Sequence, residues 1–428
     1  MPDFPAKALE PRNGQVITFY SYKGGTGRTM ALANVAWILA ANGRRVLVAD
    51  WDLESPGLHR FFRPFLDEAD VRNASGIIDM VRSYESLAVG IDSPEEMRRL
   101  ISESTHVQRD AISLGWDFQN GGSLDFLSPG RQNFDYSSSL ASMDWNSFYE
   151  RLNGGEFVDG IRADMKAHYD YVLIDSRTGL SDIAAICTAQ LPDVLVDCFT
   201  LSMQGIVGAA EVARSVEQRH AHRGIRILPV PMRVEPYEME KVEAGRLDAE
   251  RRFAGLPSGM TEDDRRKYWT TVEVPYKPFY AYEETLAVFG DAPGRSGTLL
   301  AAFEQLTAYI TNDAITKLPP MEEQVRSRVS LQFIRKPPQV SDRVIVEFLP
   351  EDEVWGEWIA DILRSVDIGV GVEVRPLPSG DLPADETAGR AQTLTVVSAR
   401  FVDWYRARPE PKAANSWSRW LASLTKNV

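Results

Sequence analysis

The N-terminal part of the chain alternates short apolar runs with stretches that repeat apolar residues at helical spacing. Residues 15–20 (QVITFY) are mostly β-branched or aromatic, and a second apolar run, RRVLVAD, occupies residues 44–50. Between these runs Gly43 marks a helix end, and the apolar positions before it recur at helical spacing: Leu32, Val35, Ala36 and Leu39. The pattern predicts one strand–helix–strand unit with parallel strands and a glycine-rich turn after the first strand.

The same alternation continues as far as residue 316. Three further apolar runs predict strands at residues 171–175, 193–200 and 225–234. Runs that are apolar throughout are typical of parallel strands covered on both faces. The fold class expected is therefore α/β, with a doubly wound and mostly parallel sheet, closed by a helix at residues 297–316.

Two segments interrupt this alternation. Residues 63–150 form an elaboration between two core strands, with a helical stretch near 76–101 and then a hairpin or strand that ends in a Ser-Pro-Gly turn. Residues 238–270 are polar and charged, which predicts an exposed helical segment.

A second, smaller domain is expected after a linker. Paired prolines near both ends of residues 319–341 predict the linker, which leaves domains at residues 1–318 and 342–428. The second domain begins with a strand–helix–strand pattern. Its predicted helix repeats apolar residues at helical spacing: Trp355, Trp358, Ile359, Ile362 and Val366.

The composition narrows the class of protein. The chain has 428 residues, 44% hydrophobic and 25% charged, an ordinary globular composition that is too long for one compact core. Its net charge of -14 repels phosphate backbones and anionic lipids, so no nucleic-acid partner is expected. The sequence has no secretory signal and no apolar run of membrane-spanning length, so we expect a cytoplasmic protein with Cys187 and Cys198 as buried thiols.

A glycine-rich turn, KGGTGRT at residues 23–29, stands between the first strand and its helix. Such a turn directs unpaired backbone N–H groups and the positive end of a helix dipole at one point, where a phosphate chain binds. Gly24, Gly25 and Gly27 allow the close backbone approach that this requires. Thr29, at the start of the helix, is placed to coordinate Mg²⁺ through its hydroxyl.

Carboxylates follow two of the predicted strands, as a magnesium ion and an attacking water would require. Asp50 and Asp52 come directly after the second strand, and Asp175 ends the strand at residues 171–175. A lone aspartate after an apolar run is common, but the glycine-rich turn and the two acidic positions are three elements in order, each at a strand end, and together they indicate a nucleotide site. For each aspartate the alternative is capping of a turn or helix.

The stretch YSYKGGTGRTMALANVAW, residues 20–37, departs from the standard loop GxxxxGK[ST], because Tyr22 replaces the first glycine and Arg28 the lysine. It resembles instead the deviant loop KGGxGK[ST] of the MinD/ParA class of P-loop ATPases (the SIMIBI class), in a KGGxGR variant. The resemblance implies ATP and Mg²⁺ as ligands. It also implies a nucleotide-dependent homodimer in which Lys23 reaches the partner's nucleotide.

The same resemblance implies roles for individual residues. Lys23 and Asp52 would be catalytic, with Asp52 orienting the attacking water, and Gly179 would contact the γ-phosphate. The metal ligands would be Thr29, Asp52 and Asp175. The nucleotide contacts would come from Gly24, Gly25, Thr26, Gly27, Arg28, Thr29 and Met30.

The base is expected to bind between the end of the strand at residues 225–234 and the loop at residues 274–280. Arg233 is a candidate either for stacking on adenine or for pairing with a carboxylate. Pro275 and Tyr276 lie at the positions where, by the same resemblance, proteins of the MinD/ParA class close over the base. No guanine-reading NKxD motif is present, so ATP is expected rather than GTP.

Arg28 leaves the activity open. Arginine keeps the positive charge and offers a planar fork to phosphate oxygens, but it is bulkier than lysine, so binding should survive better than turnover. We expect an ATP-binding, ATP-hydrolysing switch. The alternatives are a nucleotide-binding scaffold without turnover, a site that has lost its nucleotide, and a kinase resembling the bacterial tyrosine kinases, against which the absence of a tyrosine-rich tail counts.

The second domain is similar to bacterial TIR domains, a flavodoxin-like module, in its order of strand, acidic turn, WGEWI helix, strand and VVSARFVD segment. The resemblance implies a protein partner, and the module is expected to be incomplete. NAD cleavage is not expected, because Glu410 lies between Pro409 and Pro411 and cannot take a helical position. The apolar stripe at residues 417–424 carries few basic residues nearby, which predicts packing rather than stable membrane anchoring.

Overall fold

The computed structural model describes most of the chain in two compact units, one ending at Ile334 and one beginning at Arg335. The described residues are 13–132, 136–179, 181–235, 237–334, 343–366, 371–377 and 391–406. Glu410 and the apolar stripe at residues 417–424 lie outside them. Among the described residues, no helix is both long and apolar enough to cross a membrane.

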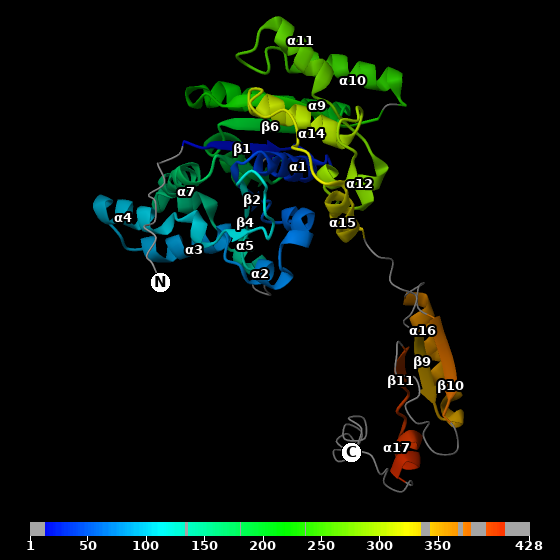
Figure 1. Ribbon diagram of the computed structural model, residues 1–428. Helices are drawn as coiled ribbons and strands as arrows, with labels where there is room; N and C mark the ends of the chain where they lie inside the picture. The colour runs from blue at the N-terminus through cyan, green and yellow to red at the C-terminus, as the bar shows by residue number, and fades with distance from the viewer. Residues whose placement is uncertain are drawn as a thin grey trace, which may run out of the picture. The chain divides into compact units, whose positions relative to one another are not determined.

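The first unit is built on an eight-stranded sheet with the strand order β3-β4-β2-β5-β1-β6-β7-β8 (Figure 1). Every neighbouring pair is parallel except β3 and β4. The strands are β1 (Gln15–Tyr20), β2 (Arg45–Trp51), β3 (Ile112–Ser113), β4 (Ser123–Leu127), β5 (Tyr171–Ser176), β6 (Val194–Phe199), β7 (Arg226–Val234) and β8 (Val274–Pro275). The expected α/β fold with a large, mostly parallel sheet is confirmed.

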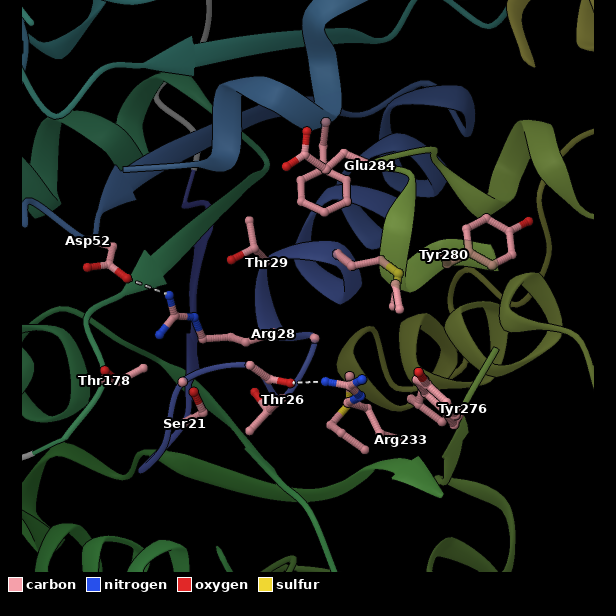
Figure 2. A pocket seen from close by; sticks show the side chains of 18 of the residues that line it. Ser21, Thr26, Arg28, Thr29, Asp52, Thr178, Arg233, Tyr276, Tyr280 and Glu284 are labelled. Carbon is pink, nitrogen blue, oxygen red and sulfur yellow. Dashed lines mark hydrogen bonds and ion pairs between the residues drawn. The ribbon is translucent and has the colours of Figure 1, made fainter. Parts of the chain in front are cut away.

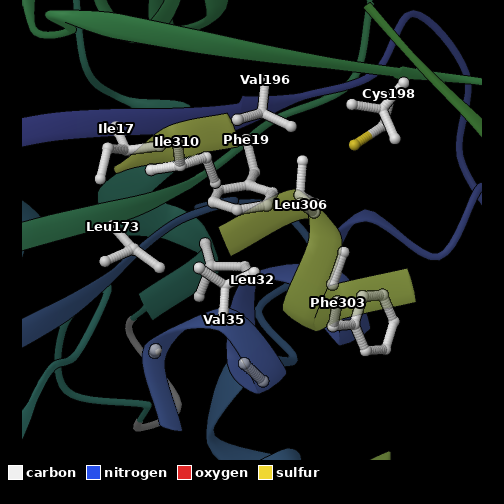
Figure 3. Packing of buried hydrophobic residues seen from close by; sticks show 14 of the residues in the cluster. Ile17, Phe19, Leu32, Val35, Leu173, Val196, Cys198, Phe303, Leu306 and Ile310 are labelled. Carbon is white, nitrogen blue, oxygen red and sulfur yellow. The ribbon is translucent and has the colours of Figure 1, made fainter. Parts of the chain in front are cut away.

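The two faces of the sheet bury different residues of the same strands, because successive side chains of a strand point to opposite faces. Ile17 and Phe19 face a cluster that includes α1 (Arg28–Ala41), α14 (Leu299–Ile310) and α13 (Ala287–Gly290). Figure 3 shows Leu32 and Val35 of α1 meeting Phe303 and Leu306 of α14 over these strands. The opposite cluster contains Val16 and is covered by α3 (Ile77–Ala88), α4 (Pro94–Ser104), α7 (Gly154–His168) and η3 (Ile186–Gln190).

The elaboration at residues 63–150 is partly an extension of the sheet. Its β4 pairs with β2, and β3 and β4 run antiparallel as a hairpin would. The helical stretch expected near 76–101 is divided into α3 and α4, because Pro94 starts a new helix capped by the Ser93 hydroxyl. Other elements in and after this segment are η1 (Leu58–Phe65), α2 (Glu68–Asn73), η2 (Val107–Arg109), α5 (Tyr136–Ala141) and α6 (Trp145–Arg151).

Helices also occupy the segments after β5. They are α8 (Asp182–Ala185), α9 (Met203–Arg219), η4 (Ala221–Arg223), α10 (Met239–Arg252), α11 (Glu262–Thr271) and α12 (Pro278–Tyr282). The polar segment at residues 238–270 forms α10 and most of α11, in agreement with the expected helical segment. It is not wholly exposed, because Tyr268 and Trp269 are buried.

The segment expected to be a linker, residues 319–341, contains a helix that packs on the first unit. In α15 (Glu323–Phe333), Val329 and Phe333 are buried, and the Phe333 ring lies 6.1 Å from the ring of Phe65. Arg326 donates a hydrogen bond to the carbonyl oxygen of Asp291 at 2.7 Å. The flanking prolines predicted a linker, but Val329 and Phe333 of this helix are buried against the first unit, which therefore continues past residue 318 to Ile334.

The second unit has a three-stranded parallel sheet of order β10-β9-β11. Its elements are β9 (Arg343–Phe348), η5 (Pro350–Asp352), α16 (Glu353–Val366), β10 (Gly371–Pro376), β11 (Ala391–Thr395) and α17 (Ala399–Arg406). Small residues of α16, Gly356 and Ala360, are buried, and a methyl group on Gly356 would come within 2.2 Å of the Phe348 ring. The two tryptophans predicted on the apolar side of this helix therefore do not face the sheet, because Trp355 and Trp358 are 58% and 57% exposed.

Candidate functional site

The glycine-rich turn follows β1 and ends where α1 begins at Arg28. Gly25 and Gly27 have φ values of +74° and +92°, a conformation that glycine adopts without strain. A side chain at Gly24 or Gly25 would meet no atom within 4 Å, so the turn faces open space. The first turn of α1, whose N–H groups lack partners within the helix, begins beside this space, as expected of an anion-binding loop.

This open space is one end of a cavity of about 590 Å³. The predicted contact residues from Gly24 to Met30 all line it, together with Asp52, Arg233 and Pro275. At the other end, away from Asp52, Figure 2 shows Tyr276 and Tyr280, and the lining also includes the apolar side chains of Phe61, Met232, Val274 and Leu299. The cavity thus has a polar end rich in backbone N–H groups and an apolar end lined by aromatic side chains.

Arg233 joins the turn to the apolar end. Its backbone is left-handed, with φ of +55°, and its Nη1 donates a hydrogen bond to the carbonyl oxygen of Gly25 at 2.6 Å. The guanidinium lies 4.7 Å from the centre of the Tyr276 ring, within cation–π range (Figure 2). Arg233 therefore stacks on an aromatic ring of this chain, and among the residues that the structure describes no ion pair joins it to a carboxylate, which was the other possibility.

The predicted metal ligands do meet, but they surround a guanidinium. Arg28 Nε donates to Asp175 Oδ1 at 2.6 Å. Arg28 Nη2 donates to Asp52 Oδ2 at 3.0 Å, as Figure 2 shows. The Thr29 hydroxyl donates to Asp175 Oδ2 at 2.7 Å. Both oxygens of Asp175 therefore accept hydrogen bonds from the start of α1. In this arrangement the site does not fit a divalent ion at Asp175.

Burial makes this pairing strong. Arg28 and Asp175 are 6% and 1% exposed. Burial raises the pKa of the Asp175 carboxyl, while the nearby Arg28 charge and the hydrogen bonds from Thr29 and Arg28 work in the opposite direction. For Arg28, burial disfavours the charged form, but Asp175 and Asp52 outweigh it, so its pKa is raised. Among the residues that the structure describes, no cluster of three or more His, Cys, Asp or Glu side chains could hold a metal ion.

Asp50 has the alternative role of turn capping. Its carboxylate accepts hydrogen bonds from the backbone N–H groups of Asp52 at 3.2 Å and of Gly57 and Leu58, both at 3.1 Å. Asp50 is fully buried, and burial together with the nearby Asp175 charge raises its pKa to about 8. It therefore shapes the loop between β2 and η1, the loop that carries Asp52.

Lys23 and Gly179 are not among the described residues that line the cavity. Lys23 is exposed, and its Nζ donates a hydrogen bond to Gln204 Oε1 of α9. Gly179 has a left-handed backbone with φ of +76°, and its carbonyl oxygen accepts a hydrogen bond from the Tyr20 hydroxyl at 3.1 Å. Gly179 lines a neighbouring cavity with Tyr20 and Tyr22.

Arg177 and Glu54 were not predicted from the sequence as site residues. Both line the cavity beside Asp52, and Arg177 Nη2 lies 2.6 Å from Glu54 Oε2. Each follows the end of a core strand closely, as Asp52 does. Position relative to a strand end was the signal that could have found them, since the ends of parallel strands meet at one edge.

A comparison with known protein families gives one match. Residues 17–257, more than half of the chain, match the family model described as "CobQ/CobB/MinD/ParA nucleotide binding domain". No curated protein matches the chain.

Several solved structures are similar in fold at low identity. The septum site-determining protein MinD with Mg-ADP from Pyrococcus horikoshii OT3 is 16% identical, with a TM-score of 0.45, over 69% of this chain and 96% of that chain. MinD in the MinC:MinD complex of Aquifex aeolicus is 17% identical, with a TM-score of 0.43, over 72% and 98%. A ParA family ATPase from Chlorobium tepidum TLS is 15% identical, with a TM-score of 0.40, over 74% and 98%. From the family match, the chain belongs to the CobQ/CobB/MinD/ParA nucleotide-binding domain family.

Proposed function

We propose that this chain is an ATP-binding molecular switch of the MinD/ParA type. ATP binds in the cavity between the glycine-rich turn and Tyr276, its binding drives homodimer formation, and hydrolysis resets the switch. The observation that carries the proposal is the open cradle at Gly24 and Gly25, which begins a cavity that ends in aromatic side chains. A volume of about 590 Å³ is in the range of small-molecule sites.

The two ends of the cavity match the two ends of a nucleotide. Backbone N–H groups at the start of α1 and the helix dipole favour the triphosphate. The stacked pair of Arg233 and Tyr276 offers a flat surface to a base, and Pro275 lines the cavity beside it. ATP rather than GTP remains part of the proposal, and a comparison of the two ligands by calorimetry tests it.

Replacing Gly25 with alanine is expected to weaken ATP binding at least about tenfold. A methyl group there occupies the cradle, and the left-handed backbone costs an L-residue about 1–2 kcal/mol. Isothermal titration calorimetry of the full chain measures the affinity. Gly121→Ala is the matched control, because Gly121 has φ of +72° and open space around it but does not line the cavity. Equal affinities in the two variants would place the nucleotide elsewhere.

Lys23 is proposed to act across the dimer interface, which its exposed position outside the chain's own cavity supports. We expect Lys23→Ala to bind ATP normally but to dimerise at least about tenfold more weakly, because an interfacial charge contact is lost. Size-exclusion chromatography with light scattering, with and without ATP, measures this. Lys241→Ala, which removes an exposed lysine of α10, should dimerise like the wild type. Normal dimers of Lys23→Ala would contradict the assignment.

A nucleotide-binding scaffold without turnover is the second candidate, and the bonds of Arg28 favour it. Asp52, the residue proposed to orient the attacking water, is held by the Arg28 guanidinium at 3.0 Å. Steady-state phosphate release separates the candidates: a switch hydrolyses ATP and Asp52→Asn abolishes this, whereas a scaffold shows no release above the background of Asp52→Asn.

The second unit is proposed to be a TIR-like module that passes the nucleotide state to a protein partner. The order β10-β9-β11 corresponds to the 2-1-3 order of flavodoxin-like sheets, which supports this assignment. The exposed Trp355 and Trp358 of α16 offer apolar surface for a protein contact.

We place the protein in the cytoplasm and expect no nucleic-acid partner or stable membrane anchor. Binding to DNA and to anionic vesicles at two salt concentrations tests the last two points.

A further inference from the structure

The cluster formed by Arg28, Asp52 and Asp175 contains the carboxylates that a divalent ion would need. The carboxyl ends of β2 and β5 bring these aspartates together, since Asp50 is the register partner of Asp175 and Asp52 follows β2 by one residue. The third oxygen expected at a metal, the Thr29 hydroxyl, donates its hydrogen to Asp175. The cation at the centre of this oxygen set is the guanidinium of the chain itself.

We propose that Arg28 takes the place of a divalent metal in this site: its guanidinium bridges Asp52 and Asp175 as their permanent counter-ion. The nucleotide is then bound without a metal ion coordinated by these carboxylates. Only the part about nucleotide binding without a coordinated metal rests on the proposed function. The pairing of Arg28 with Asp52 and Asp175 in place of a metal does not depend on whether a nucleotide binds.

Geometry explains why the guanidinium stays between the carboxylates. Its planar fork offers separate nitrogens to two acids, Nε to Asp175 and Nη2 to Asp52, whereas a lysine ammonium has a single nitrogen. If Arg28 turned toward a phosphate, the buried Asp175 would lose its ionic partner. A divalent ion at Asp175 would have to displace Arg28 or Thr29 from its oxygens.

A triphosphate has other partners in the same cavity. Backbone N–H groups at the start of α1 face it. Arg177, Arg233 and Lys277 also line the described cavity and add positive charge near the ligand. Arg177 is paired with Glu54, whereas Arg233 contacts a carbonyl oxygen and a ring, so its charge is not neutralised by those two contacts. Phosphate charge is therefore compensated without Arg28 and without a metal at Asp175.

Manganese binding to the nucleotide-free full chain tests the replacement directly. Electron paramagnetic resonance of Mn²⁺ should show no specific site in the wild type, and Arg28→Ala should gain one site at least about tenfold tighter than any in the wild type. Arg28→Lys serves if Arg28→Ala does not fold, and it should gain a weaker site. Arg233→Ala removes a cation of the same cavity that touches neither carboxylate, and it should gain none. Asp175→Asn in the Arg28→Ala background should remove the new site.

Nucleotide binding gives a second readout. The wild type should bind ATP with similar affinity, within about threefold, in magnesium and in EDTA, whereas Arg28→Lys should bind at least about tenfold more weakly in EDTA. A specific Mn²⁺ site in the wild type that depends on Asp175, or no gain of a site in the folded Arg28 variants, would overturn the proposal. A tenfold loss of wild-type ATP affinity in EDTA would overturn it as well. Absence of ATP binding in both buffers would overturn the proposed function, and the Mn²⁺ titration would still decide the role of Arg28.

Discussion

Replacing Arg28 with methionine is expected to lower the free energy of unfolding by about 3–5 kcal/mol, because it removes one partner of a buried ion pair. Arg28 lies 2.6 Å from Asp175 and 3.0 Å from Asp52, and Arg28 and Asp175 are almost inaccessible to solvent. Methionine fills similar space but leaves Asp175 without its cation. Urea unfolding of the full chain at pH 7 measures the change.

Two control variants separate the buried ion pair from a general effect of losing arginine. The triple variant Arg28→Met, Asp52→Asn, Asp175→Asn removes all three charges and should recover most of the lost stability. Arg99→Met breaks an exposed pair with Glu103 at 2.8 Å, and its stability should match that of the wild type. If Arg28→Met and Arg99→Met unfold at the same urea concentration, the buried pair does not form in solution.

Replacing Asp197 with valine is expected to stabilise the protein by about 2–4 kcal/mol at pH 7. Asp197 lies in β6, is fully buried, and has no hydrogen-bond partner for either carboxyl oxygen among the described residues. Burial raises the pKa of this carboxyl well above its ordinary value. Valine suits the strand and needs no partner, as Val194 and Val196 beside it show.

The pH dependence of stability gives the sign of this effect. The folded protein keeps the Asp197 proton at pH values where the unfolded chain has lost it. Stability therefore falls as pH rises above the unfolded pKa near 4, by about 1.4 kcal/mol per pH unit, until the folded pKa is reached. Asp50, with its pKa raised to about 8, acts in the same direction between pH 4 and 8. The Asp197→Val variant should thus lose part of the slope and keep the part due to Asp50.

Urea unfolding at pH 5, 6, 7 and 8 measures both the gain and the slope. Asp125→Val is the matched control, because Asp125 also lies in a strand but accepts hydrogen bonds from the hydroxyls of Tyr169 at 2.9 Å and Ser113 at 2.5 Å. That variant should be less stable than the wild type. A wild-type slope in Asp197→Val would mean that the Asp197 carboxyl is solvated or paired in solution.

Local patterns were enough to predict the sheet and the glycine-rich turn. The turn depends on neighbouring residues alone, since Gly25 and Gly27 take left-handed conformations and the helix begins at the next residue. Asp52 and Asp175 could be placed at one edge of the sheet because parallel strands end on the same side. The spacing of β-branched and apolar residues was therefore sufficient for the fold class and for placing Asp52 and Asp175 at one edge of the sheet.

Contacts between distant segments decided the rest. The linker prediction failed at α15 because burial of Phe333 against Phe65 depends on residues about 270 positions apart. Tyr276 lines the cavity because β8, which ends just before it, pairs with β7. Arg233 contacts Gly25 because its backbone is left-handed, a conformation that the sequence around it does not predict.

The sequence alone determined that a cation, two carboxylates and a glycine-rich turn would share one edge of a parallel sheet, because parallel strands end on the same side of the sheet. Only the tertiary structure decided which of these groups neutralise one another. Burial makes an unpaired charge costly, so Arg28 pairs with Asp175 and Asp52 inside the protein. In the same buried region Asp50 accepts hydrogen bonds from its own loop, whereas Asp197 has no hydrogen-bond partner within the described part of the chain.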